Sequence, residues 1–328
     1  MYKIKEKLED FIVKEKTNIK GKQERDRYVY FFLKKQNLTT IEAIERIANK
    51  LKIKIKRIGF AGNKDKKAIT EQLISFFKVS KERIENLKLK NISLKFYGYG
   101  NKPILLGDLE GNYFIIVVRN LTKKDIDRFN KNKNKKALNL FGEQRFSKQN
   151  IKIGKALIKK DFKKAIELII KNEGCYERDV KEYLKENKND FVGALRKINK
   201  NILKLYIHAY QSYIFNKTLK EYSKNTNKQE KIPIVGFGTD LNVFNKKIRE
   251  IIEKIMKEEG ISFRDFIIKQ IPELSSFGGE RDLFIEIKNF SYKIMDDDLN
   301  IGKKKMILKF FLKKGCYATT VIKFLFSN

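Results

Sequence analysis

Residues 58–77 of this 328-residue chain read IGFAGNKDKKAITEQLISFF. An apolar segment leads into a polar one, residues 61–67, and a second apolar segment runs from Ile69 to Phe77. Glycine and asparagine favour a tight loop between two strands, and this loop holds one carboxylate, Asp65, among three lysines. The neighbouring cations would keep the carboxylate ionised, as a nucleophile or a base must be. The same residues also fit an ordinary surface turn.

Strand and helix patterns follow one another elsewhere in the chain without a fixed alternation. Segments rich in aromatic and β-branched residues predict strands over residues 11–13, 28–33 and 113–118. A further strand is predicted over 53–60, where Ile53 and Ile55 alternate with lysines. Helical spacing predicts helices over residues 151–170, 207–219 and 244–257. A mixture of this kind favours an α+β fold over a doubly wound sheet.

The first helix has a clear start in the sequence. Thr39 and Glu42 have the spacing of a capping box, which predicts a helix that begins after Thr39. Its predicted buried stripe consists of four residues at helical spacing: Ile41, Ile44, Ala48 and Leu51.

The charge balance points to an anionic partner. Lysine and arginine number 74 against 40 aspartates and glutamates, a formal net charge of +34. Such an excess attracts polyanions, and nucleic acid is the usual intracellular one. The abundance of Lys, Ile and Asn also fits an A+T-rich genome, so composition alone is a weak indication. The N-terminal segment is charged and no long apolar run exists, so we expect no signal peptide, no membrane span and a cytoplasmic protein.

Cysteine and histidine are too few for most metal or disulfide chemistry. Cys175 and Cys316 are the two cysteines and His208 is the one histidine. This composition predicts neither a disulfide framework nor a zinc site.

Several segments resemble one family in the same order. Residues 59–70 resemble the motif that carries the catalytic aspartate of TruD-type tRNA pseudouridine synthases. Residues 5–15 (KEKLEDFIVKE) are similar to the family's N-terminal stretch, with Leu8 at a usual proline, and 139–146 (NLFGEQRF) to its Asn-aromatic-Phe-Gly-x-Gln-Arg-Phe box, with Leu140 at a usual aromatic. Further matches cover residues 208–216, 272–283 and 315–320.

The resemblance implies a set of site residues. Asp65 matches the catalytic aspartate, and Lys5 and Phe11 match a lysine and an aromatic near the active site, where Lys5 is a candidate ion-pair partner of Asp65. Asn139 and Phe141 match the residues that line the uridine pocket, where an amide reads the base edge and an aromatic ring stacks on it. Lys35, Asn37 and Thr40 match a stretch before the first helix, to which we assign no catalytic role.

The resemblance also implies the domain organisation. Residues 1–220 and 285–328 would form a catalytic domain with a mixed, largely antiparallel sheet and helices. Residues 221–284 would form the inserted TruD-specific α/β domain, with an RNA cleft between the two.

The implied function is isomerisation of uridine to pseudouridine in tRNA, at position 13, by a monomeric enzyme without metal or cofactor. Whether Asp65 attacks the ribose, attacks the base or abstracts a sugar proton stays open. One alternative is a non-catalytic RNA-binding or ribosome-associated protein, which explains the charge equally well. Another is a metal-dependent nucleic-acid hydrolase, for which Asp296, Asp297 and Asp298 form the only tight acidic run. We expect that run to be a solvated turn before a strand.

Overall fold

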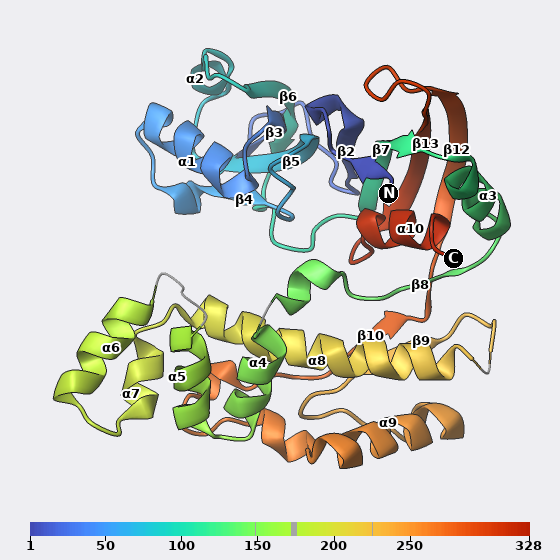
Figure 1. Cartoon of the computed structure of the whole chain (residues 1–328). Helices are drawn as coiled ribbons and strands as arrows, with labels where there is room; N and C mark the ends of the chain where they lie inside the picture. Colours follow the sequence, from blue (N-terminus) through green and yellow to red (C-terminus); the bar gives the residue numbers. More distant parts are fainter. Residues whose placement is uncertain (148, 172–175, 225) are drawn as a thin grey trace. The chain divides into compact units, whose positions relative to one another are not determined.

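A computed structural model describes residues 1–147, 149–171, 176–224 and 226–328. The chain divides into two compact units (Figure 1). The sheet unit comprises residues 1–135, 286–318 and 322–328, and the helical unit comprises residues 136–285 and 319–321. None of the helices in the described ranges is long and apolar enough to cross a membrane.

A nine-stranded sheet is the framework of the sheet unit. Its strands follow the order β12-β13-β7-β2-β5-β3-β6, with β1 added to β7 and β4 to β5. Their bounds are β1 Lys3–Ile4, β2 Phe11–Lys16, β3 Tyr28–Gln36, β4 Ile58–Phe60, β5 Ile69–Phe77, β6 Ile92–Gly100, β7 Gly111–Leu121, β12 Ile287–Asp296 and β13 Lys304–Lys313. β2 and β5 are parallel, whereas the other pairs are antiparallel. The predicted mixed, largely antiparallel sheet in an α+β protein is therefore confirmed.

Helix α1 (Thr40–Leu51) packs against β3 and β5 (Figure 1). Thr39 caps its N-terminus together with Glu42, as the sequence predicts. The predicted buried stripe is partly wrong, because Ile41 is 44% exposed and the apolar face instead consists of Ala43, Ile44, Ile47, Ala48 and Leu51.

The sheet unit also contains the shorter helices α2 (Lys81–Glu85) and α3 (Lys123–Asn132). The two ends of α10 (Ala318–Leu325) belong to it as well, whereas residues 319–321 fall in the helical unit. The ring centroid of Phe129 in α3 lies 5.8 Å from that of Phe326, just beyond α10, and 4.8 Å from that of Tyr292 in β12. Asn132 donates from Nδ2 to the carbonyl oxygens of Phe324 and Ser327. These contacts hold the chain's last helix next to α3.

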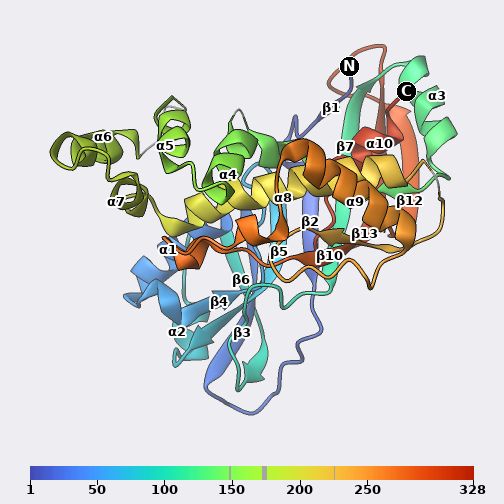
Figure 2. The same ribbon diagram turned by 90° about the horizontal axis from the view of Figure 1, so that it is seen from below.

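The helical unit is built around α8, with α4 and α9 alongside it (Figure 2). Its helices are α4 Asn150–Ile158, α5 Phe162–Lys171, α6 Glu177–Glu186, α7 Phe191–Arg196, α8 Lys200–Tyr222 and α9 Lys246–Glu259. Two short antiparallel pairs accompany them, β9 (Lys231–Ile234) with β10 (Gly279–Asp282) and β8 (Ala137–Leu138) with β11 (Phe284–Ile285).

Two features differ from the sequence-based expectation. Residues 55–57 form a short 3-10 helix, so the predicted strand is limited to β4, and Ile55 is exposed. The first compact boundary follows Lys135 rather than residue 220, because α4 packs on α8 and α8 packs on α9 and β9. Residues 221–284 as an inserted domain in the family sense stay a prediction.

Candidate active site

The loop with Asp65 joins the antiparallel strands β4 and β5. Gly59 lets the backbone approach the segment after β6, since a Cβ at this position would lie 2.4 Å from the carbonyl oxygen of Ile104. On the same side, the amide of Gly107 donates to the carbonyl of Ala61 over 2.8 Å. The base of the loop is thereby fixed against a neighbouring segment.

Asp65, Lys5 and Phe11 come together in the sheet unit. The side chain of Asp65 is 47% exposed, and Lys5 Nζ lies 2.8 Å from its Oδ2. The same ammonium lies 4.1 Å from the centroid of the buried Phe11 ring, a cation–π contact. One side of the carboxylate is therefore held while the group as a whole remains accessible. The geometry matches the ion pair expected from the sequence.

Buried polar side chains hold the backbone of the Asp65 loop. Thr40 Oγ1 accepts from the amide of Lys64 over 2.9 Å and donates to Gln72 Oε1 over 3.0 Å. Gln72 in turn donates from Nε2 to the carbonyl of Gly62 over 3.0 Å. Thr40 and Gln72 are fully buried, where an unpaired polar group would be costly, so each contact restrains the loop.

A buried ion pair also restrains the Asp65 loop. Lys64 Nζ lies 2.6 Å from Glu15 Oε2, and the two side chains are only 6% and 1% exposed. Glu15 also accepts from the amide of Leu73 over 3.3 Å. Burial raises the pKa of Glu15, although Lys64 opposes the shift.

Arg119 anchors the segment that carries Lys5. Its buried guanidinium contacts the carboxylates of Asp10, Asp297 and Asp298, each at 2.8 Å. The hydrogen bonds that Arg119 donates to Asp10 are the largest influence and raise the pKa of Arg119. Lys5 itself has a left-handed backbone, with φ of 61°. Such a conformation costs a non-glycine residue about 1–2 kcal/mol, so it requires firm anchoring of the flanking residues.

The acidic run near the C-terminus is a solvated turn only in part, because Asp296 and Asp298 are exposed whereas Asp297 is buried. Asp297 is buried against Arg119, because the guanidinium and the amides of Asn120 and Leu299 supply its partners. Burial opposes ionisation of Asp297, yet these hydrogen bonds lower its pKa to about 2. Asp297 and Asp298 thus hold an arginine, whereas Asp296 pairs with Lys304. Over the described ranges, no group of three or more His, Cys, Asp and Glu side chains has the arrangement of a metal site.

Asn139 and Phe141 lie together in the helical unit, directly after β8. Asn216 of α8 fixes the backbone of Phe141, since its Oδ1 accepts from the Phe141 amide over 2.9 Å and its Nδ2 donates to the Phe141 carbonyl over 3.0 Å. Phe215 packs edge-on against the Phe141 ring with centroids 5.3 Å apart. The position of the aromatic residue is set by the central helix.

Two guanidinium groups cover the Phe141 ring. Arg281 lies 4.1 Å and Arg145 lies 4.9 Å from its centroid. Arg281 also donates to Oδ1 of Asn139 over 2.6 Å and to its backbone carbonyl over 3.2 Å. Arg145 has a buried Nε with no hydrogen-bond partner in the described part of the chain.

The predicted site residues therefore form two groups, Lys5 with Phe11 and Asp65 in one unit and Asn139 with Phe141 in the other. Sequence reasoning gave no role to Lys35, which lies beneath the Asp65 loop, or to Arg281. Both lie within segments that resemble the family, and this was the only available signal for them.

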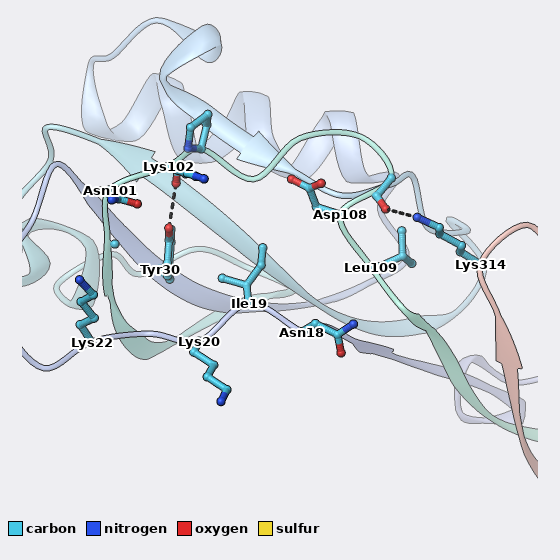
Figure 3. Close-up of a pocket in the computed structure, with 13 residues that line it drawn as sticks. Asn18, Ile19, Lys20, Lys22, Tyr30, Asn101, Lys102, Asp108, Leu109 and Lys314 are labelled. Carbon is cyan, nitrogen blue, oxygen red and sulfur yellow. Dashed lines mark hydrogen bonds between the residues drawn. The ribbon is translucent and has the colours of Figure 1, made fainter.

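A separate cavity of about 490 Å³ lies at another edge of the sheet unit (Figure 3). The Tyr30 hydroxyl donates to the carbonyl of Lys102 over 2.8 Å, and Lys314 Nζ donates to that of Gly107 over 3.0 Å (Figure 3). None of the predicted site residues lines this cavity. Its lysines give no specific signal in a chain with 74 lysines and arginines.

Cys316 follows β13 in the sheet unit, and Cys175 lies outside the described residues.

Comparison with known proteins decides the family. The family model of tRNA pseudouridine synthase D matches residues 2–175, 169–233 and 220–325. The chain belongs to the TruD family. The predicted family and the enzyme class, a pseudouridine synthase and hence an isomerase, are thus confirmed.

Individual relatives cover almost the whole TruD chain. The probable tRNA pseudouridine synthases D of Nanoarchaeum equitans and Methanosarcina acetivorans are 33% and 31% identical, over 99% and 98% of this chain and 98% and 91% of theirs. The tRNA pseudouridine synthase D of Aquifex aeolicus is 30% identical over 99% of this chain and 98% of its own. A crystal structure of TruD from Methanosarcina mazei superimposes with a TM-score of 0.76 at 28% identity, over 98% of this chain and 93% of that one.

Proposed function

We propose that this TruD protein isomerises uridine to pseudouridine in tRNA, at position 13, with Asp65 as the catalytic carboxylate. Lys5, Phe11, Asn139 and Phe141 are the proposed substrate-binding residues. The names of its relatives support tRNA as the substrate, and the resemblance of the motifs supports the position.

One observation carries the assignment of Asp65. Its carboxylate is half exposed, yet its loop is held by buried polar groups and its Oδ2 is paired with Lys5 at 2.8 Å. Functional groups need this combination of access and fixed position, whereas an ordinary surface turn does not require buried polar support.

The reaction needs no co-reactant. The bond from C1′ to N1 breaks, the base turns, and a bond from C1′ to C5 forms. The proton on C5 leaves and N1 gains one, so atoms and electrons balance. A carboxylate assists as a nucleophile at C1′ or at the base, or as a base towards a sugar proton. A primary isotope effect from deuterium at C2′ would identify the last route.

Asn139 and Phe141 have the chemistry to hold the base. Because Asn139 Oδ1 accepts from Arg281, its amide nitrogen is the group that would donate to a uracil carbonyl. The residue Phe141 is only 9% exposed, and its ring centroid lies 4.1 Å from one guanidinium group and 4.9 Å from another. We therefore expect the base to displace Arg145, whose contacts are weaker than those of Arg281.

A site-mapped assay tests the proposal. Unmodified tRNA transcript is incubated with wild-type protein, Asp65→Asn or Asp127→Asn, then treated with carbodiimide and analysed by primer extension. Asp127 is an exposed carboxylate on α3 and serves as the matched control. We expect a stop next to uridine 13 with wild type and the control, and less than about 1% of that rate with Asp65→Asn.

The affinity of the same proteins for tRNA would be measured in parallel. Phosphate contacts dominate RNA affinity, so Asp65→Asn should bind tRNA within a few-fold of wild type. Activity of Asp65→Asn near the wild-type rate would exclude Asp65 as the catalytic group. Tight binding without any stop on tRNA would favour a non-catalytic RNA-binding protein instead.

A further inference from the structure

Lys35 is a buried lysine that has no carboxylate partner among the described residues. It lies near the end of β3, with the whole residue only 1% exposed. Its Nζ donates to the carbonyl oxygens of Leu38 over 2.6 Å, Asp65 over 3.0 Å and Lys64 over 3.5 Å. No Asp or Glu of the described ranges forms an ion pair with it. Lysine is almost never fully buried unless it is paired, so this arrangement calls for a reason.

We propose that Lys35 is a positioning residue for the isomerisation, because its ammonium fixes the backbone from which the Asp65 carboxylate projects. This inference rests on the proposed role of Asp65. Its new content is that a residue which cannot reach the substrate determines where the catalytic carboxylate lies.

The other contacts of the loop leave this task to Lys35. Thr40 binds the amide of Lys64, and Gln72 binds the carbonyl of Gly62, both before Asp65 in the chain. Lys5 binds the side chain of Asp65. In the part of the chain that the structure describes, only Lys35 contributes a side-chain hydrogen bond to the backbone of Asp65. Without this hydrogen bond, Lys5 would still hold the side chain of Asp65, but the backbone of Asp65 would no longer be held by Lys35.

The charge of Lys35 has a cost that agrees with a functional role. Burial lowers its pKa to about 8, while the charges of Asp65 and Glu42 oppose that shift and Lys64 reinforces it. An uncharged residue in this place would avoid the desolvation of an ammonium. Buried groups with perturbed pKa values occur preferentially at functional sites.

Lys34 provides a matched control. It is the same residue type on the same strand, it is exposed, and its side chain points to the other face of the sheet. Lys35→Met and Lys34→Met therefore remove the same charge from neighbouring positions. Single-turnover rates with saturating enzyme and the Kd for tRNA would be measured for both, beside Asp65→Asn.

We expect Lys35→Met to lower the single-turnover rate about 10- to 100-fold, as small misplacements of catalytic groups do. Its Kd for tRNA should stay within about threefold, and Lys34→Met should match wild type in both. A purely structural role would instead lower the active fraction and leave the rate of the folded molecules unchanged. A wild-type rate for Lys35→Met beside an inactive Asp65→Asn would overturn the inference but leave the proposed function intact. An active Asp65→Asn would overturn both.

A second variant covers the case in which Lys35→Met does not fold. In Lys35→Ala, propylammonium in solution should occupy the vacated channel and raise the rate without changing the Kd for tRNA. The circular dichroism spectrum would be recorded with and without the amine. A folded Lys35→Ala protein with a reduced rate that does not respond to the amine would count against the proposed positioning by an ammonium group.

Discussion

Replacing Lys64 by methionine would leave Glu15 buried without its ion-pair partner. The carboxylate of Glu15, whose side chain is 1% exposed, would keep only the hydrogen bond from the amide of Leu73 at 3.3 Å. Removing one partner of a buried ion pair costs about 3–5 kcal/mol, because the remaining charge is desolvated without compensation. We therefore expect Lys64→Met to lower the free energy of unfolding by this amount at about pH 8.

The pH dependence gives a second signature of the same variant. The pKa of Glu15 is already raised above its ordinary value of 4.5, and the loss of Lys64 raises it further. The folded state then binds more protons than the unfolded state between about pH 4.5 and the raised pKa, so stability falls as the pH rises through this window. Part of the loss should accordingly be regained when Lys64→Met is studied at about pH 5.5.

Urea denaturation at both pH values would measure these effects. Lys66→Met is the control, because Lys66 lies in the same loop as Lys64 but forms an exposed ion pair, with Glu42 of α1. We expect no resolvable change in the free energy of unfolding for this variant. The double variant Glu15→Leu with Lys64→Met should recover much of the stability, since it removes both charges. A Lys64→Met protein within about 1 kcal/mol of wild type and insensitive to pH would refute the reasoning.

Two further predictions concern how the protein acts on tRNA and binds it. Phe141→Ala should lose about 1–3 kcal/mol of base stacking, measured as kcat/KM on tRNA transcript, and unchanged kinetics would remove Phe141 from the uridine pocket. The binding constant for tRNA should fall linearly with salt on logarithmic axes, with a slope of about −0.7 to −0.9 per phosphate neutralised, and a flat response would contradict binding through several phosphates.

Local signals in the sequence predicted local structure well. The capping box at Thr39 is confirmed because it depends on a few adjacent residues. Ile41 and Ile55 were placed wrongly because periodicity alone does not show where a face ends. In both cases the remainder of the fold, not the local pattern, decides which apolar residue is buried.

Long-range polar contacts were beyond such reasoning. The contact between Lys5 and Asp65 was expected only through the family resemblance. Lys35 donates to the backbone carbonyl of Asp65, thirty positions away, and Arg281 binds Asn139 from a distant strand. Every residue carries the same backbone carbonyl, so the pattern of residue types does not show which carbonyl will accept a hydrogen bond. Arg119 is a similar case, since its three carboxylates come from two distant segments.

The Arg119 cluster joins residues that are made far apart in time during synthesis. Asp10 and Arg119 emerge from the ribosome early, whereas Asp297 and Asp298 follow after residues 136–285 of the helical unit. A nascent chain that has completed the Asp65 loop therefore still lacks two of the three carboxylates that neutralise Arg119 and anchor the segment with Lys5. Incomplete chains would carry every residue of the loop while the buried guanidinium is paired with Asp10 alone.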